Sequence, residues 1–150
     1  VQPDLQGNDY ALQRQLKAEA RTKLIDVLDE LKIIPTSMID ISDGLTSEVL
    51  HLSKQSEVGI TIYEDKLPID HTTMNLAKEM KLNPIFCALN GGEDYELLFT
   101  ISQEHYEKIK KDIDFTVIGH VTDKSEGNNF VTKDNTSHPI TAQGWDPIKK

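Results

Sequence analysis

The amino-acid sequence predicts an α/β (α+β) sandwich in which one mixed β-sheet is covered by helices. Segments with helical periodicity alternate with short apolar segments of strand character, which is the pattern of a layered domain. With 150 residues, 37% of them hydrophobic, the chain is long enough for one real core and short for two full domains. We therefore expect an arm or interdomain linker over residues 1–15, which lack clear periodicity, and one α/β domain over residues 16–150.

The first half of this domain is predicted to alternate helix and strand. Apolar residues recur at steps of three and four in the helical segments, and alternate with other residues in the strands. Pro35 ends the first helix, and the pair Asp43-Gly44 separates the first strand from the second helix. The expected elements are a helix from Leu16 to Leu31, a strand from Met38 to Ile41, a helix starting at Leu45 and a strand from Val58 to Tyr63.

The second half repeats the alternation with shorter segments. The strand over residues 95–101 is largely apolar on both faces, so we expect it in the centre of the sheet. Asn, Asp, Ser and Thr are frequent in residues 122–143, which favours a hairpin at the sheet edge. The expected elements are a helix from Asp70 to Met80, a short apolar stretch from Ile85 to Leu89, a strand from Tyr95 to Ile101, a helix capped by Ser102, a strand from Phe115 to Val121, and that hairpin.

Composition excludes several classes of function. The net charge is −9 and the pI is about 4.9, so a general nucleic-acid-binding surface is excluded, because an acidic domain repels phosphate backbones. No run of 18 apolar residues occurs and the first residues do not resemble a signal peptide, so we expect a cytoplasmic protein without a membrane span. Cys87 is the only cysteine, which excludes intramolecular disulfides and thiolate-based zinc sites.

The first candidate site is the segment Ile39-Asp40-Ile41-Ser42-Asp43-Gly44. Strand alternation sends Asp40 and Ser42 to one face, and Asp43 follows where the strand meets the next helix. Phosphate is attracted to a helix N-terminus but repelled by two carboxylates, so divalent cations would have to lie between them, and Mg²⁺ fits these hard oxygen ligands best. The alternative is structural: Ser42 or Asp43 caps the helix and Asp40 is merely solvated.

The second candidate site is Asn90-Gly91-Gly92-Glu93-Asp94-Tyr95-Glu96. A glycine pair allows close approach of a ligand, and the acids that follow lead into an apolar strand, where they require a partner. The alternative is a solvent-facing turn made polar by these acids. Trp145, near the C-terminus, either packs on the core or stacks on an aromatic ligand.

Together these motifs resemble the C-terminal half of thiamine-monophosphate kinases. The resemblance rests on four segments in order: Ser37 to Leu45 (SMIDISDGL), Ala88 to Phe99 (ALNGGEDYELLF), Ile118 to Val121 and Gly144 to Asp146. These kinases belong to the superfamily of aminoimidazole-ribonucleotide synthetase, in which an N-terminal ATP- and metal-binding domain joins a C-terminal α/β domain. The resemblance therefore implies the fold of that C-terminal domain and an ATP-dependent transfer of phosphate to thiamine monophosphate, which yields thiamine diphosphate.

The resemblance also implies a role for each matching residue. Asp40 and Asp43 correspond to Mg²⁺ ligands, Ser42 to an ATP contact, and Glu93 and Trp145 to substrate contacts. No residue is expected to act as a catalytic base, because the acceptor is already a phosphate oxygen and alignment and charge neutralisation are what the transfer needs.

One departure from the family pattern bears on activity. The aspartate-rich motifs of the family's N-terminal ATP-binding domain are absent from this chain. We therefore expect a domain that folds but does not catalyse the transfer alone, in a full-length protein that is a homodimer. Two alternatives stay open: a non-catalytic module that binds thiamine phosphates or a partner, and another ATP-dependent enzyme of the same superfamily, such as a selenophosphate synthetase or a hydrogenase-maturation protein.

Overall fold

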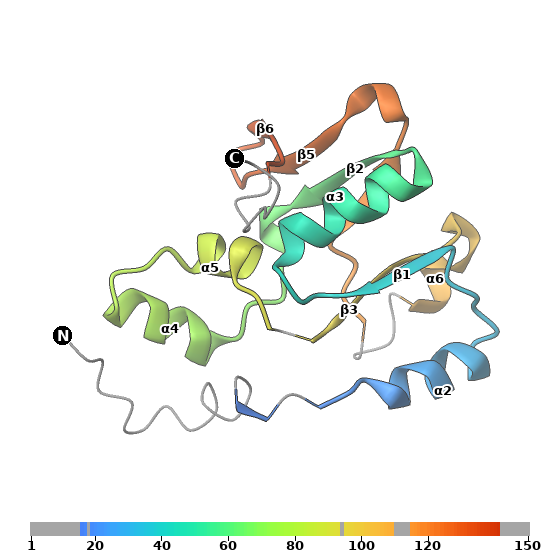
Figure 1. Cartoon of the computed structure of the whole chain (residues 1–150), viewed down its shortest axis with the longest axis horizontal. Coiled ribbons are helices and arrows are strands. Elements are labelled where there is room, and N and C mark those ends of the chain that lie inside the picture. The colour runs from blue at the N-terminus through green and yellow to red at the C-terminus, as the bar shows by residue number, and fades with distance from the viewer. Residues whose placement is uncertain (1–15, 18, 94, 110–114, 142–150) are drawn as a thin grey trace, which may run out of the picture.

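The predicted alternation of helices and strands is confirmed by a computed structural model (Figure 1), which describes residues 16–17, 19–93, 95–109 and 115–141. The expected arm over residues 1–15 lies outside these. The helices are α2 (Thr22–Glu30), α3 (Leu45–Ser56), α4 (His71–Glu79), α5 (Pro84–Asn90) and α6 (Tyr106–Ile109). The strands are β1 (Ser37–Asp40), β2 (Gly59–Tyr63), β3 (Leu97–Thr100), β4 (Gly119–Thr122), β5 (Asn128–Val131) and β6 (Ser137–Pro139).

The predicted mixed sheet is confirmed. It has four strands in the order β4-β2-β5-β6, with β2 antiparallel to β4 and parallel to β5. Strands β5 and β6 form an antiparallel pair, and β6 lies at the edge, where the sequence predicted a hairpin. The predicted strand over residues 115–121 is shorter than expected, because the paired residues begin only at Gly119.

Strands β1 and β3 form a second, two-stranded antiparallel sheet, in which Asp40 lies opposite Leu97. The prediction that β3 is central in its sheet is therefore wrong for the described part of the chain, where its only neighbour is β1. The apolar character of both its faces has another cause: Leu98 packs against one hydrophobic cluster and Phe99 against another. The two-stranded sheet thus lies between two small cores.

Helix α3 provides half of the buried residues of the larger core. Its buried residues pack against β2, and the partly buried Ile39 and Ile41 join them from the first strand and the segment after it. Figure 1 shows α3 lying between the four-stranded sheet and the β1–β3 pair. The buried members of this cluster are Leu45, Val49, Leu52, Ile60, Ile62 and Ile140. The smaller cluster comprises Leu28, Ile33 and Ile109, and joins α2 to α6.

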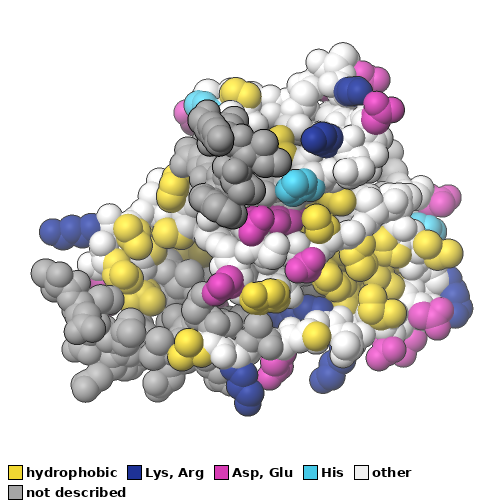
Figure 2. All heavy atoms as spheres, viewed as in Figure 1, with side chains coloured by type: hydrophobic (Ala, Val, Ile, Leu, Met, Phe, Trp, Pro, Cys, Tyr) yellow, Lys and Arg dark blue, Asp and Glu magenta, His cyan; other side chains and the backbone are white. Residues whose placement is uncertain are grey.

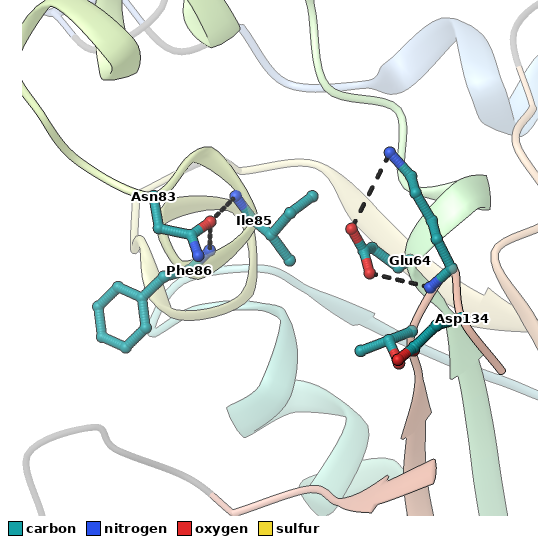
Figure 3. Close-up of polar contacts among 7 residues, drawn as sticks. Glu64, Asn83, Ile85, Phe86 and Asp134 are labelled. Carbon is teal, nitrogen blue, oxygen red and sulfur yellow. Dashed lines mark hydrogen bonds and ion pairs between the residues drawn. The ribbon is translucent and has the colours of Figure 1, made fainter. Parts of the chain in front are cut away.

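The apolar stretch after Asn83 is a helix, α5, that the sequence analysis did not assign. Asn83 is its N-cap: the side-chain Oδ1 accepts hydrogen bonds from the backbone N–H groups of Ile85 (2.9 Å) and Phe86 (3.3 Å), as Figure 3 shows. Pro84 occupies the first turn, where the missing N–H removes no helical hydrogen bond. Five apolar residues were too few for helical periodicity to be read from them.

A second polar contact in Figure 3 ties the turn after β5 to the end of β2. Glu64 Oε2 accepts a hydrogen bond of 3.1 Å from the backbone N–H of Lys133, and the side chain of Lys133 lies 3.9 Å from Glu64 Oε1. These contacts hold the parallel pair β2–β5 beyond its last ladder residues.

No helix in the described ranges has both the length and the apolar character needed to span a bilayer.

Candidate functional site

The acidic corner lies where the sequence predicted it, between the end of β1 and the start of α3. Asp40 is the last residue of β1, and α3 begins at Leu45. Ser42 and Asp43 lie in the short connection between them. The side chains of Asp40 and Asp43 are exposed, and Ser42 is half-buried. Figure 2 shows acidic side chains near the middle of the face where Figure 1 places this junction.

Helix capping does not explain the two polar residues before the helix. The N-cap of α3 is Gly44, and no side chain makes a capping hydrogen bond there. Instead, Glu48 reaches back from the helix: its Oε1 lies 3.3 Å from the backbone N of Asp43 and 3.5 Å from Ser42 Oγ. The alternative in which Ser42 or Asp43 caps α3 is therefore wrong: the Ser42 hydroxyl bonds to Glu48, and the Asp43 side chain is exposed.

The structure brings the two candidate motifs together through their backbones. The N–H of Glu93 donates to the carbonyl of Ser42 at 2.8 Å, and the N–H of Tyr95 donates to that of Ile41 at 2.9 Å. In return, the N–H of Ile41 donates to the carbonyl of Glu96 at 2.8 Å. The acidic corner and the glycine turn, residues 90–96, are thus one site formed by segments about fifty residues apart in the sequence.

Two glycines make this close approach possible. A Cβ on Gly92 would lie 2.6 Å from the carbonyl oxygen of Ser42, and one on Gly44 would lie 3.0 Å from the backbone carbonyl carbon of Asn90. Gly44 also has a φ of +118°, which residues with a side chain rarely adopt. Thr46 Oγ1 adds a hydrogen bond of 3.0 Å to the carbonyl of Leu89. The site therefore needs glycine at both contact points.

The glycine turn carries backbone strain as well. Glu93 has a φ of +65° and Tyr95 a φ of +51°, values in the left-handed region that are uncommon for residues other than glycine. Both side chains are exposed. Strain of this kind persists only where surrounding contacts impose it, and here the hydrogen bonds to residues 41 and 42 do so. Asp94, between them, and Trp145 lie outside the described residues.

Sequence reasoning missed two charged residues of the site. Arg21, just before α2, pairs with Glu96, and its Nε lies 2.8 Å from Glu96 Oε2. No local pattern could have revealed this pair, whose members are 75 residues apart. Glu48 was detectable: it shares the helical spacing of the core positions Leu45, Val49 and Leu52, and an acid among core positions predicts a buried carboxyl group.

The donor set suits a hard cation only as part of a larger site. In the ranges that the structure describes, no group of three or more His, Cys, Asp or Glu side chains is placed to hold a metal ion. The corner offers the carboxyl oxygens of Asp40 and Asp43. Mg²⁺ is commonly bound by one or two carboxylates together with phosphates and water, so these two residues fit it without completing its coordination.

Comparison with known proteins identifies the family. The sequence profile of the AIR synthase related protein, C-terminal domain, matches residues 4–131. The chain belongs to this family. Two curated relatives are named thiamine-monophosphate kinase: that of Pyrococcus abyssi is 35% identical over 139 residues, and that of Aquifex aeolicus is 38% identical over 134 residues. These alignments cover 90% and 89% of this chain, but only 42% and 40% of the relatives.

Solved structures agree with this family domain. A structure described as AaThiL complexed with AMPPCP and TMP has a TM-score of 0.75 and 31% identity, and covers 99% of this chain and 44% of that one. The crystal structure of the Aquifex aeolicus thiamine monophosphate kinase has a TM-score of 0.68 over 87% of this chain and 41% of that one, at 31% identity. The chain thus spans less than half the length of these relatives. The hydrogenase maturation protein HypE of E. coli shares the fold alone. Its TM-score is 0.66 at 18% identity, over 85% of this chain and 41% of its own.

Proposed function

We propose that this chain is the C-terminal domain of a thiamine-monophosphate kinase. Together with an N-terminal ATP-binding domain, it transfers the γ-phosphoryl group of ATP to thiamine monophosphate and yields thiamine diphosphate. The observation that carries the proposal is the backbone pairing of the acidic corner with the glycine turn, because it joins the two motifs most typical of these kinases in one site. The names of the relatives, and the AMPPCP and TMP in one solved relative, support the same activity.

The acidic corner is proposed as the phosphate-facing side of the site. Asp40 and Asp43 hold Mg²⁺, and Ser42 contacts ATP. When bound, Mg²⁺ neutralises negative charge on the polyphosphate. This lowers the repulsion between ATP and the phosphate of thiamine monophosphate during the transfer. The chain's own residues position the reactants. The exposed carboxylates orient the cations, and the hydrogen bonds from the N–H groups of residues 93 and 95 to the backbone of residues 41 and 42 hold the acidic corner in place.

The glycine turn and the C-terminal residues are proposed to contact the substrate. Glu93 complements the positive charge of the thiazolium ring, and Trp145 stacks on a ring of the substrate. No general base is required of either segment, because the attacking atom is an oxygen of the substrate phosphate. Specificity for thiamine monophosphate then depends on Glu93 and Trp145, and phosphoryl transfer on the acidic corner.

The test is an activity assay on the chain and on a chimera. The chain alone, supplied with ATP, Mg²⁺ and thiamine monophosphate, is expected to form no thiamine diphosphate. A chimera that joins the N-terminal part of the Aquifex aeolicus relative to this chain is expected to form it, as measured by chromatography of the products. A folded chimera that binds ATP but forms no thiamine diphosphate would contradict the proposal, and so would full kinase activity of the chain alone.

Titration calorimetry separates this proposal from a stand-alone binding module. Half of a composite site binds thiamine monophosphate weakly, because the nucleotide, the cations and the other domain supply most contacts. A module that evolved to bind thiamine phosphates alone would bind it tightly. Tight binding by the chain without ATP and Mg²⁺ would therefore favour the module over the kinase domain.

A further inference from the structure

Glu48 is the most buried charged residue in the described part of the chain. It lies in the first turns of α3, and only 2% of its surface is exposed. Its Oε1 faces the acidic corner and lies 3.3 Å from the backbone N of Asp43 and 3.5 Å from the Oγ of Ser42. Its Oε2 is buried and has no hydrogen-bond partner among the described residues.

This arrangement is unfavourable for stability alone. A buried carboxyl group with one oxygen unused destabilises a fold relative to an apolar residue of similar size. The other buried polar side chains of α3 have backbone partners: Thr46 donates to the carbonyl of Leu89 at 3.0 Å, and Ser53 to that of Val58 at 2.6 Å. Glu48 instead accepts hydrogen bonds from Ser42 and Asp43, two residues of the proposed phosphate site. This points to a functional reason for its burial.

We infer that Glu48 is a positioning residue that holds the Ser42–Asp43 turn in the shape that presents the Asp43 carboxylate to the cation. The inference rests on the proposed function and adds a residue that its motifs did not include. Glu48 itself is not proposed to touch a reactant. It accepts hydrogen bonds from the Asp43 backbone and the Ser42 hydroxyl on the inner side of the turn, while the Asp43 carboxylate remains exposed.

The first measurement is hydrogen exchange of the Asp43 amide, followed by NMR on the whole chain. In Glu48→Ala this amide is expected to exchange about tenfold faster, because its acceptor is gone. In Glu48→Gln, which keeps an acceptor oxygen, the rate is expected to stay within about threefold of the original. Ser53→Ala is the matched control, since it removes a buried hydrogen bond from the same helix, away from the corner.

The second measurement is line broadening of the amides of residues 42–44 by Mn²⁺, used as a probe for Mg²⁺. Glu48→Ala is expected to require about tenfold more Mn²⁺ for the same broadening, Glu48→Gln to restore most of the response, and Ser53→Ala to leave it unchanged. A purely structural role would lower the melting temperature of Glu48→Ala without this pattern. If Glu48→Ala does not fold, Glu48→Asp replaces it, because the shorter side chain withdraws the acceptor by one methylene.

The outcomes separate the inference from the proposed function. Unchanged Asp43 exchange in Glu48→Ala, or equal acceleration in Ser53→Ala, would overturn the role of Glu48. Equal thiamine diphosphate formation by the chimera and by its Asp43→Asn variant would instead overturn the magnesium site of the proposed function, because the chain alone supplies only part of the cation's ligands. In that case the exchange rates still decide whether Glu48 holds the turn.

Discussion

Single residues set the shape of the site mainly through their backbones. The carboxylates of Asp40 and Asp43 are exposed, and what fixes their position is the contact of the corner with the glycine turn. The acids and the glycines were both visible in the sequence, and their places at a strand end, a helix start and a turn were predicted. Their mutual hydrogen bonds were not, because backbone pairing between distant loops leaves no periodic pattern.

Gly44 provides the sharpest test of this backbone contact. Gly44→Ala is expected to destabilise the chain by about 1 kcal/mol more than Gly127→Ala, because both glycines have positive φ but only Gly44 approaches another backbone segment. A Cβ at Gly127 would meet nothing within 4 Å. Chemical denaturation of both variants measures the difference. Equal destabilisation would show that the contact with Asn90 contributes nothing.

Asp43 tests the chemistry of the corner. Asp43→Asn is expected to change the free energy of unfolding by less than about 0.5 kcal/mol, because its side chain is exposed. In the chimera it is expected to lower thiamine diphosphate formation by about tenfold or more, because a cation ligand is lost. Asp65→Asn, at another exposed acid, is the control. Unchanged activity in Asp43→Asn would remove Asp43 from the proposed cation site.

At the scale of elements, helix starts were easier to predict than helix lengths or strand partners. Asp70 was expected to open a helix, and it is the N-cap of α4. The first helix is shorter than its periodic residues suggested, because α2 begins only at Thr22. Helix capping depends on a few neighbouring residues and can therefore be predicted from the sequence, whereas strand pairing depends on the whole fold.

The cap of α4 predicts a dependence of stability on pH. The backbone N–H of Thr72 donates to Asp70 at 2.7 Å and, with the Thr72 side chain, lowers the pKa of Asp70 below its ordinary value of 3.8. The carboxylate therefore stabilises the fold above that pH, and the contribution is lost as pH falls below 3.8 through the lower folded-state pKa. Asp70→Ser keeps a capping oxygen that does not titrate, so it is expected to lose less stability in acid during urea denaturation. Identical acid dependence in both proteins would contradict this.

At the scale of the whole molecule, the chain has two small cores with the β1–β3 sheet between them. Ile39 and Leu98 pack against the cluster around α3 and β2, whereas Phe99 and Ile101 pack against the cluster that joins α2 to α6. The sequence showed that strand 95–101 is apolar on both faces, and this is correct. It did not show that the two faces belong to two different hydrophobic clusters, because burial alone does not reveal what covers a residue.

Because β3 contributes to both cores, we expect them to unfold together. Leu28→Ala, in the smaller core, is expected to destabilise the chain by about 2–5 kcal/mol and to lower the temperature of one calorimetric transition without dividing it. Ile62→Ala, in the larger core, is expected to do the same. Ile25→Ala is the control, because this side chain of α2 is 52% exposed and its truncation should change stability by less than about 0.5 kcal/mol. Two separate transitions in Leu28→Ala would show that α2 and α6 melt away from an intact site, and that the β1–β3 sheet does not couple the cores.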